Sequence, residues 1–132
     1  MIQTRVCNSE DFDEIAALLR QLWPDKPQDL VSLRQVYLCA TVDGRVAGFG
    51  SLTIKSNLWC EGFLGFVDEL VVDEAHRDRG IGTKLLDDLI SGARERGCHR
   101  VELDSAFHRK AARAFYERRG FQSRAYLYSK PL

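Results

Sequence analysis

The sequence has little of several features that would point to other classes of protein. It carries no net charge, because 19 lysines and arginines balance 19 aspartates and glutamates. This balance disfavours a nucleic-acid partner, which usually requires a basic surface. No apolar run approaches the ~18 residues of a membrane-spanning helix. Repeats, low-complexity tracts and linkers are also absent, so we expect a protein that acts without nucleic acid and without a membrane.

The four cysteines show none of the spacings that are typical of metal sites. Cys7, Cys39, Cys60 and Cys98 are scattered, and no two of them form a CxxC pair. Three lie in apolar segments, where cysteine usually serves as a small buried side chain. Charged and polar residues interrupt the beginning of the sequence, so it does not resemble a secretory signal. These features favour a reduced, cytoplasmic protein that binds no metal.

What the sequence does contain is enough apolar chain for one domain. Its 132 residues are 45% hydrophobic and 29% charged, which is ordinary for a soluble globular domain. Periodicity predicts strands over 2–7, 37–42, 46–54, 63–72 and 100–104, with one or two more over 121–129. Helices are predicted over 12–22, after Pro27, from Thr83 and over 108–119, with a loop over 55–62.

The order of these elements, βααβββαβαβ(β), predicts the class of fold. Strands and helices are mixed along the chain, which indicates an α/β fold (an α+β mixed sheet) with helices on both faces of the sheet. Asp43-Gly44 predicts a hairpin turn between two of the strands, with Arg45 as a further candidate for the loop.

The most informative stretch is a strand that leads through a glycine-rich turn into a helix. Leu70, Val71 and Val72 end the strand, and Arg77-Asp78-Arg79-Gly80-Ile81-Gly82 forms the turn. The first turn of a helix has free N–H groups and the positive end of the helix dipole, so it favours an anion. The turn is not a GxxxxGK[ST] loop, and Leu85 breaks the dinucleotide fingerprint. The stretch therefore indicates another kind of anion site, or a solvated basic turn.

Two motifs give this turn a more specific interpretation. Arg77 to Gly82 resembles the R/Q-x-x-G-x-G/A signature of the GNAT superfamily of acetyl-CoA-dependent N-acetyltransferases. Ala112 to Phe121 resembles the A-x-x-[FL]-Y-x-x-x-G-F motif that follows it in the same family. The order of elements is also that of the family, although the first third of the chain matches by pattern alone. The resemblance implies a single N-acetyltransferase domain over 1–132, with the GNAT-type acyl-CoA N-acyltransferase fold.

The resemblance also implies where acetyl-CoA binds. Main-chain N–H groups of the turn would hold the pyrophosphate, here those of Arg77, Asp78, Arg79, Gly80, Ile81, Gly82 and Thr83. The main chain of Leu70, Val71 and Val72 would align the pantetheine arm, and a splay between this strand and 101–104 would admit the thioester. The N–H near Val72 would donate to the acetyl carbonyl. Ala112 and Phe115 are further candidate contacts, although Phe115 also suits the core. Arg109 stands where many members have asparagine, so it would contact a phosphate or face water.

Two residues are the first candidates for proton transfer. Tyr116 matches a tyrosine that stands near the coenzyme sulfur in many members, where it would protonate the leaving thiolate, unless it only packs. An attacking amine with a pKa of ~10.4 must lose a proton, and Glu69 is the first candidate base. Asp68, Asp73, His108 and a water chain remain alternatives. Glu69 also fits a structural ion pair, or a charge that orients a cationic substrate.

The acceptor is defined less well than the coenzyme. In the family its side of the site is built from two loops, and both contain a tryptophan and acidic residues here, namely Trp23, Asp25, Asp29, Trp59 and Glu61. Aromatic rings beside carboxylates suit a cationic amine, although each tryptophan would equally pack its loop onto the core. We expect a small amine or a peptide or protein lysine as substrate, and a monomer or homodimer.

The leading hypothesis is an acetyl-CoA-dependent N-acetyltransferase in which a primary amine attacks the thioester directly. One alternative is a non-catalytic acyl-CoA-binding sensor or regulatory domain on the same fold, and the presence of Tyr116 and Glu69 argues against it. A second alternative is a transferase of a longer acyl group, which bulky residues in the splay would exclude.

Overall fold

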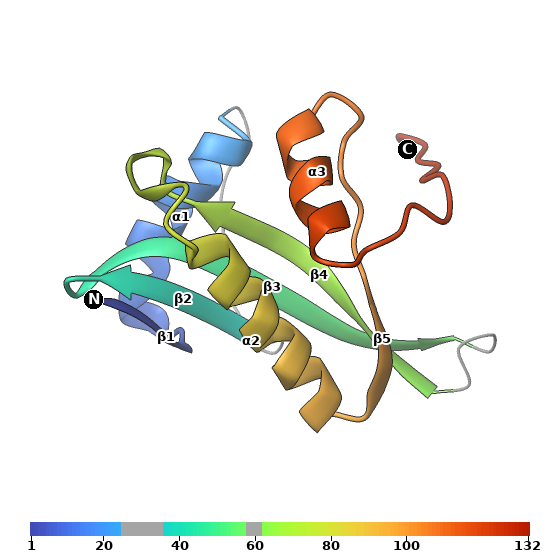
Figure 1. The fold of residues 1–132 in the computed structure, drawn as a ribbon, viewed down its shortest axis with the longest axis horizontal. Helices are drawn as coiled ribbons and strands as arrows, with labels where there is room; N and C mark the ends of the chain where they lie inside the picture. The colour runs from blue at the N-terminus through green and yellow to red at the C-terminus, as the bar shows by residue number, and fades with distance from the viewer. Residues whose placement is uncertain (25–35, 58–61) are drawn as a thin grey trace. The chain divides into compact units, whose positions relative to one another are not determined.

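The computed structural model describes residues 1–24, 36–57 and 62–132. It forms two compact units, Met1–Glu102 and Leu103–Leu132, and each is described by itself. The elements of the first unit, drawn in Figure 1, are β1 (Ile2–Val6), η1 (Ser9–Asp11), α1 (Phe12–Leu22), β2 (Val36–Val42), β3 (Arg45–Asn57), β4 (Gly62–Val72), η2 (Glu74–His76), α2 (Ile81–Glu95) and β5 (Cys98–Glu102). The second unit contains α3 (Lys110–Arg118).

The strands of the first unit form one mixed sheet in the order β1-β2-β3-β4-β5. The first four strands pair antiparallel, and β5 pairs parallel with β4. Asp43 and Gly44 connect β2 to β3 with φ of 52° and 83°, the left-handed conformations of a two-residue hairpin turn. Arg45 pairs with Val42 and therefore belongs to the strand, not to the loop. The predicted hairpin and mixed sheet are confirmed.

Helices α1 and α2 cover opposite faces of this sheet (Figure 1). The cluster on the α1 side is made of Cys7, Ile15, Leu18, Leu19, Cys39, Val46, Phe49 and Val71. The cluster on the α2 side is made of Ala40, Ala47, Ile81 and Leu85. A Cβ atom at Gly48 would lie 2.9 Å from Leu85 Cδ1, and one at Gly50 would lie 2.9 Å from Leu89 Cδ1. These two glycines therefore allow α2 to approach β3 closely.

The short helix η1, which leads directly into α1, begins with a capping box, in agreement with the polar cluster at residues 8–11. The Asn8 side chain accepts a hydrogen bond from the Glu10 N–H at 2.9 Å, and Asp11 accepts one from the Asn8 N–H at 2.9 Å. Two N–H groups that the helix itself cannot bond are thereby satisfied. The helix ends at Leu22, just ahead of Pro24.

In the second unit, α3 ends at a left-handed glycine and carries an aromatic group. Gly120 has a φ of 92°, as expected for a glycine that terminates a helix. The ring of Tyr116 lies edge-on to Phe115 and Phe121, with centroid separations of 5.4 and 5.9 Å. Tyr116 therefore packs within this unit through both of its aromatic neighbours.

Several predicted boundaries were wrong. Strand β3 continues through 55–57, where a loop was expected, because these residues pair with 62–64 of β4. Strand β5 lies at Cys98–Glu102 rather than 100–104, α2 begins at Ile81 rather than Thr83, and α3 spans Lys110–Arg118 rather than 108–119. The helix expected after Pro27 lies outside the described residues.

The strand or strands predicted over 121–129 were also wrong, since residues 121–132 adopt no regular secondary structure. A strand is stabilised by pairing and by burial of one face. Here Tyr126, Leu127 and Tyr128 are 75%, 72% and 89% exposed. Despite their β propensity, these residues are neither paired in a sheet nor buried on one face.

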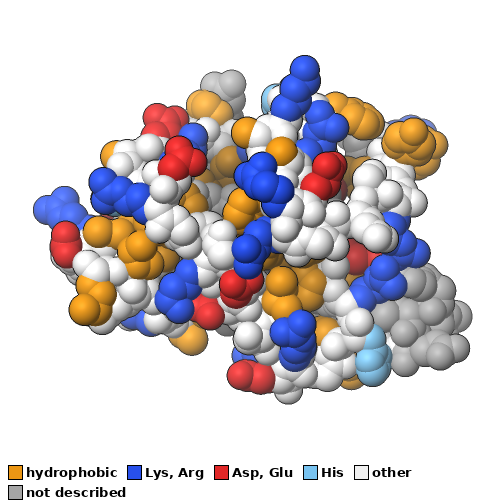
Figure 2. Space-filling view, in the orientation of Figure 1, with side chains coloured by type: hydrophobic (Ala, Val, Ile, Leu, Met, Phe, Trp, Pro, Cys, Tyr) orange, Lys and Arg blue, Asp and Glu red, His pale blue; other side chains and the backbone are white. Residues whose placement is uncertain are grey.

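The charged side chains of both signs are mixed on the surface. Figure 2 shows acidic and basic side chains interspersed on the face that carries α2.

Among the described residues, no helix is both long enough and apolar enough to cross a membrane.

Candidate active site

The second half of β4 has an edge to which β5 does not pair. Pairing between the two strands runs from Phe63 to Phe66 on β4 and ends at Glu102 on β5, while β4 continues to Val72. Over 67–72, therefore, no strand among the described residues pairs with this edge. The pairing therefore ends at Phe66, and the splay expected between this part of β4 and residues 101–104 stays a prediction.

The main chain of Val72 faces this edge. The Asp73 N–H donates to the Ala47 carbonyl of β3 at 2.8 Å, and main-chain groups alternate in direction along a strand. The N–H and C=O of Val72 must then point away from β3. The Arg77 Nε–H donates to the Val72 carbonyl at 3.1 Å, which agrees with that direction and ties the glycine-rich turn to the end of β4.

The turn leaves the start of α2 without a side-chain cap. Asp78 and Gly80 have φ of 62° and 82°, and Gly80 is the N-cap residue of α2 without a side-chain hydrogen bond. The first turn of α2 contains no acidic residue, and Arg77 and Arg79 are exposed beside it. Main-chain N–H groups, the helix dipole and two cations thus favour an anion at this point.

Some of the residues predicted to bind the coenzyme can do so only through the main chain. The side chains of Val71 and Ile81 are 3% and 1% exposed and belong to the two core clusters. Leu70 and Val72 pack against the cluster on the α2 side. Gly82 and Thr83, in the first turn of α2, are partly exposed.

A β-bulge lies at the start of the open edge. Ser51 pairs with Glu69, whereas the next residue, Leu52, pairs with Val67, so Asp68 is the extra residue of β4. Bulges bend a strand and occur often beside active sites, where they redirect a side chain. The Asp68 carboxylate accepts a hydrogen bond from the Thr53 hydroxyl.

Glu69 lies next to the bulge in a row that crosses three strands. Tyr37 of β2 pairs with Ser51 of β3, which pairs with Glu69 of β4. The Ser51 hydroxyl donates to the Glu69 carboxylate, and the Glu69 N–H donates to Ser51 Oγ at 3.2 Å. Ser51 is fully buried. The Glu69 carboxylate is therefore held by a hydroxyl group that water does not reach.

Burial, together with the smaller effect of the nearby Asp68 charge, raises the pKa of Glu69 to about 7. Burial and the charges of Glu69 and Asp68 also raise the pKa of Tyr37. A carboxylate with a pKa near 7 can accept a proton at neutral pH and release it again. Of the candidate bases, Glu69 is the one whose surroundings suit this role.

The other candidates have less suitable surroundings. Asp73 caps η2, accepting from the Ala75 N–H at 3.2 Å, and lies 3.5 Å from His76 Nδ1. Asp68 is exposed and bonded to Thr53. His108 is exposed ahead of α3. Sequence reasoning missed Ser51 and Tyr37, because their link to Glu69 depends on strand register, and a serine inside an apolar strand was the only signal.

The remaining predicted residues lie on α3 and in the substrate loops. Arg109, Ala112 and Phe115 are partly buried in the second unit, as is Tyr116. Burial raises the pKa of Tyr116, while the Arg109 charge opposes that rise, so its hydroxyl is protonated at neutral pH. Trp23 packs against the cluster on the α1 side, which supports the packing role. Trp59 lies outside the described residues, as do Asp25, Asp29 and Glu61.

Comparisons with known proteins agree with this geometry. Residues 6–121 match the acetyltransferase (GNAT) family. The chain is 29% identical over 135 residues to a glucosamine 6-phosphate N-acetyltransferase of Trypanosoma brucei brucei, covering 92% of this chain and 90% of that protein. It is 28% identical over 140 residues to an aminoalkylphosphonate N-acetyltransferase of Salmonella typhimurium, covering 98% and 91%. A crystal structure of a Trypanosoma brucei acetyltransferase superposes with a TM-score of 0.84 at 27% identity over the whole of both chains.

An N-acetyltransferase is thus the class of protein that the sheet, the open strand edge and the relatives define. The chain belongs to the acetyltransferase (GNAT) family, whose members transfer acetyl groups from acetyl-CoA to amines, and the resemblance seen in the two motifs is confirmed. Both relatives are enzymes, which disfavours the non-catalytic sensor.

The raised pKa of Glu69 makes a prediction about stability. The pKa is 4.5 ordinarily and about 7 in the folded chain, so ionising Glu69 costs folding free energy increasingly between these two pH values, and fully above the second. Glu69→Gln removes that cost. We expect the Tm difference, variant minus wild type, to rise from pH 5 to pH 8 in thermal melts. For the exposed Glu95→Gln control, we expect a Tm difference that does not change between pH 5 and pH 8. A Tm difference for Glu69→Gln that does not change with pH would contradict the raised pKa.

Proposed function

We propose that this enzyme acetylates the primary amine of a small phosphorylated or phosphonylated compound, with acetyl-CoA as donor, by direct attack of the amine on the thioester. The observation that carries the proposal is Glu69, a carboxylate with a pKa of about 7 beside a bulge at the start of an open strand edge. A base of this pKa can deprotonate an ammonium ion as it approaches an acyl group.

The coenzyme would bind mainly through the main chain. The uncapped start of α2 would hold the pyrophosphate, with Arg77 and Arg79 adding positive charge. The open edge of β4 from Leu70 to Val72 would align the pantetheine arm by strand-like hydrogen bonds. The bond from Arg77 to the Val72 carbonyl would keep these two parts in a fixed relation. A free Val72 N–H at that edge would then donate to the acetyl carbonyl.

The chemical steps would balance without a metal. The amine, after Glu69 or a water bonded to it takes one proton, forms an N–C bond to the thioester carbonyl carbon. The Val72 N–H stabilises the developing oxyanion. The C–S bond then breaks, and the Tyr116 hydroxyl gives its proton to the leaving thiolate. The nitrogen loses its second proton, through water, to the Tyr116 phenolate, and Glu69 returns its proton to solvent. The products are the amide and free coenzyme A.

The substrate class is supported by what the relatives act on. One is a glucosamine 6-phosphate N-acetyltransferase and the other an aminoalkylphosphonate N-acetyltransferase. Both substrates combine a primary amine with a phosphoryl or phosphonyl dianion on a small molecule. We carry this shared chemistry, and neither individual substrate, to the present chain. It is a narrower class than the small amine or lysine that the sequence predicts.

The setting of the enzyme follows from two further features. The family match spans residues in both compact units, which supports one functional domain over 1–132. Cys7, Cys39 and Cys98 form no disulfide, which supports a reducing compartment such as the cytoplasm.

The substrate class can be tested by coenzyme A release from acetyl-CoA. The acceptors should be glucosamine 6-phosphate and aminoethylphosphonate, with glucosamine and ethylamine as matched controls that lack the dianion, and a lysine peptide. We expect kcat/KM to be higher by about 100-fold or more for the phosphorus compounds, because a buried charged contact is worth about 3 kcal/mol. Equal values for each matched pair, or preference for the peptide, would contradict the proposed class.

The proton-transfer roles predict distinct kinetic defects. Glu69→Gln should lower kcat about 100-fold and remove the rise in rate that the wild type shows as pH increases through about 7. Tyr116→Phe should lower kcat by about 10-fold or more without changing coenzyme affinity. Single-turnover rates at saturating substrates measure both effects. An unchanged pH profile in Glu69→Gln, or a wild-type rate in Tyr116→Phe, would remove the residue concerned from the mechanism.

The coenzyme site predicts a loss of binding without a loss of fold. Gly82→Glu adds bulk and negative charge in the first turn of α2, so calorimetry should show coenzyme A affinity reduced by about 100-fold. Gly92→Glu, in the same helix but well beyond its first turn, is the matched control and should bind normally. Normal binding by a folded Gly82→Glu variant would show that the pyrophosphate lies elsewhere.

A further inference from the structure

Cys39 lies far along the sequence from Cys7 and Asp11, yet the three side chains meet in the core beside the edge of the sheet. Cys7 follows β1, Asp11 ends η1, and Cys39 lies within β2. Their exposed fractions are 4%, 5% and 0%. The two Sγ atoms and a carboxylate oxygen all lie within 4.8 Å of one another, and Cys39 Sγ lies 3.9 Å from Asp11 Oδ2. The acetyl-transfer mechanism uses none of these groups.

We infer that Cys7, Asp11 and Cys39 form a binding site for a divalent thiophilic cation, with Zn²⁺ as the physiological candidate. Two thiolates and one carboxylate form a donor set that Zn²⁺ accepts, with a fourth position left for water or a small anion. Zn–S bonds of ~2.3 Å in a tetrahedral site hold two sulfurs ~3.8 Å apart. The atoms therefore need to move inward by about an ångström or less to bind the cation.

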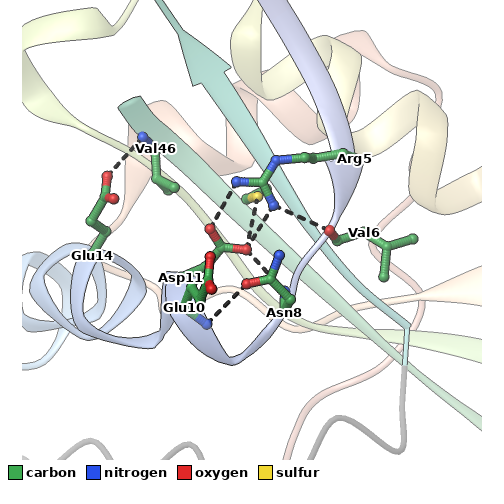
Figure 3. Close-up of polar contacts among 8 residues, drawn as sticks. Arg5, Val6, Asn8, Glu10, Asp11, Glu14 and Val46 are labelled. Carbon is green, nitrogen blue, oxygen red and sulfur yellow. Dashed lines mark hydrogen bonds and ion pairs between the residues drawn. The ribbon is translucent and has the colours of Figure 1, made fainter. Parts of the chain in front are cut away.

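The groups around Asp11 are those that a bound cation requires. Figure 3 shows the Arg5 guanidinium facing the Asp11 carboxylate, with Nη1 and Nη2 donating to Oδ2 and Oδ1 at 2.7 and 2.8 Å. The Asn8 N–H also donates to Oδ2, at 2.9 Å. Such outer contacts fix the direction of a ligating carboxylate. Each carboxylate oxygen has two lone pairs, and the bonds from Arg5 and Asn8 use both of those on Oδ2. Oδ1, which accepts from Arg5 Nη2, is therefore the oxygen that would bind the cation.

Charge balance favours a divalent over a monovalent cation. Two thiolates and the Asp11 carboxylate carry three negative charges, which a divalent cation and the Arg5 guanidinium would balance. The loaded cluster would then be neutral, which avoids the cost of burying net charge. A monovalent cation would leave one negative charge unbalanced.

Strand register disfavours a direct disulfide between the same cysteines. Cys39 pairs with Arg5, and the Cys7 N–H donates to the Tyr37 carbonyl at 3.1 Å, so the two cysteines are diagonal neighbours. Diagonal residues lie ~7–8 Å apart, whereas a disulfide usually needs Cα atoms within ~6.8 Å. A metal ion between the sulfurs spans the larger separation. Because β1 is the edge strand of the sheet, local opening there gives the cation access.

The test uses the tag-free full chain, reduced and treated with a chelator, in a Cys60→Ser, Cys98→Ser background. We expect calorimetry to show one Zn²⁺ per chain with release of two protons, measured in buffers of different ionisation enthalpy. Co²⁺ should give a thiolate-to-metal charge-transfer band, and Zn²⁺ should raise the Tm. None of these measurements depends on acetyl transfer.

Variants then assign the ligands. Cys7→Ala and Cys39→Ala preserve a small apolar side chain, so they should fold, lose the charge-transfer band and bind Zn²⁺ about 100-fold more weakly. Asp11→Asn should weaken binding while keeping the shape of the side chain. The proposal is overturned if no saturable uptake occurs at one equivalent, or if the band and affinity persist in the folded alanine variants. It is also overturned if mild peroxide oxidises Cys7 and Cys39 to a disulfide and the reduced chain takes up no metal.

Discussion

The end of the β4–β5 pairing at Phe66 is the constraint on which the proposed site depends. Up to that point the sheet is continuous, and every main-chain group between the two strands can be paired. Beyond it, β4 continues to Val72 with its outer edge unpaired by β5. An unpaired edge is usually a liability, because it invites another strand to add to the sheet. In the proposed site this edge would instead hold the coenzyme arm, since an extended amide-bearing chain can make the same hydrogen bonds.

The same part of β4 supplies Glu69, the proposed base. The extra residue at Asp68 disturbs the alternation of side chains, so that Glu69 and Val67 lie in register with Ser51 and Leu52. Glu69 is thereby held against the buried Ser51 hydroxyl, where burial makes its ionised form less favourable. A carboxylate that is costly to ionise in the folded chain is also one that readily takes a proton from an ammonium ion. The stability cost and the proposed catalytic role of Glu69 thus have one cause.

Local sequence features predicted the elements whose structure is determined locally. Asp43-Gly44 formed the expected turn because both residues tolerate left-handed conformations. Gly80 also adopts a left-handed conformation, at the start of α2. The link between Ser51 and Glu69 could not be predicted, because it depends on the register of β3 against β4. The meeting of Cys7 with Cys39 depends in the same way on the register of β1 against β2. The strand or strands expected over 121–129 did not form for the opposite reason, since β propensity alone provides neither a paired strand nor burial.

The division between main chain and side chains explains how relatives with different acceptors can share one fold. In the proposed site the coenzyme is bound by the uncapped start of α2 and the edge of β4. Both depend on backbone geometry, and the side chains of Val71 and Ile81 serve the core instead. Substitution on the acceptor side can then alter specificity without disturbing the coenzyme. In the proposed mechanism Glu69 would serve both functions, because its backbone belongs to β4 and its carboxylate would receive the proton of the amine. Its pKa, set by burial in the sheet, need not change when the acceptor does.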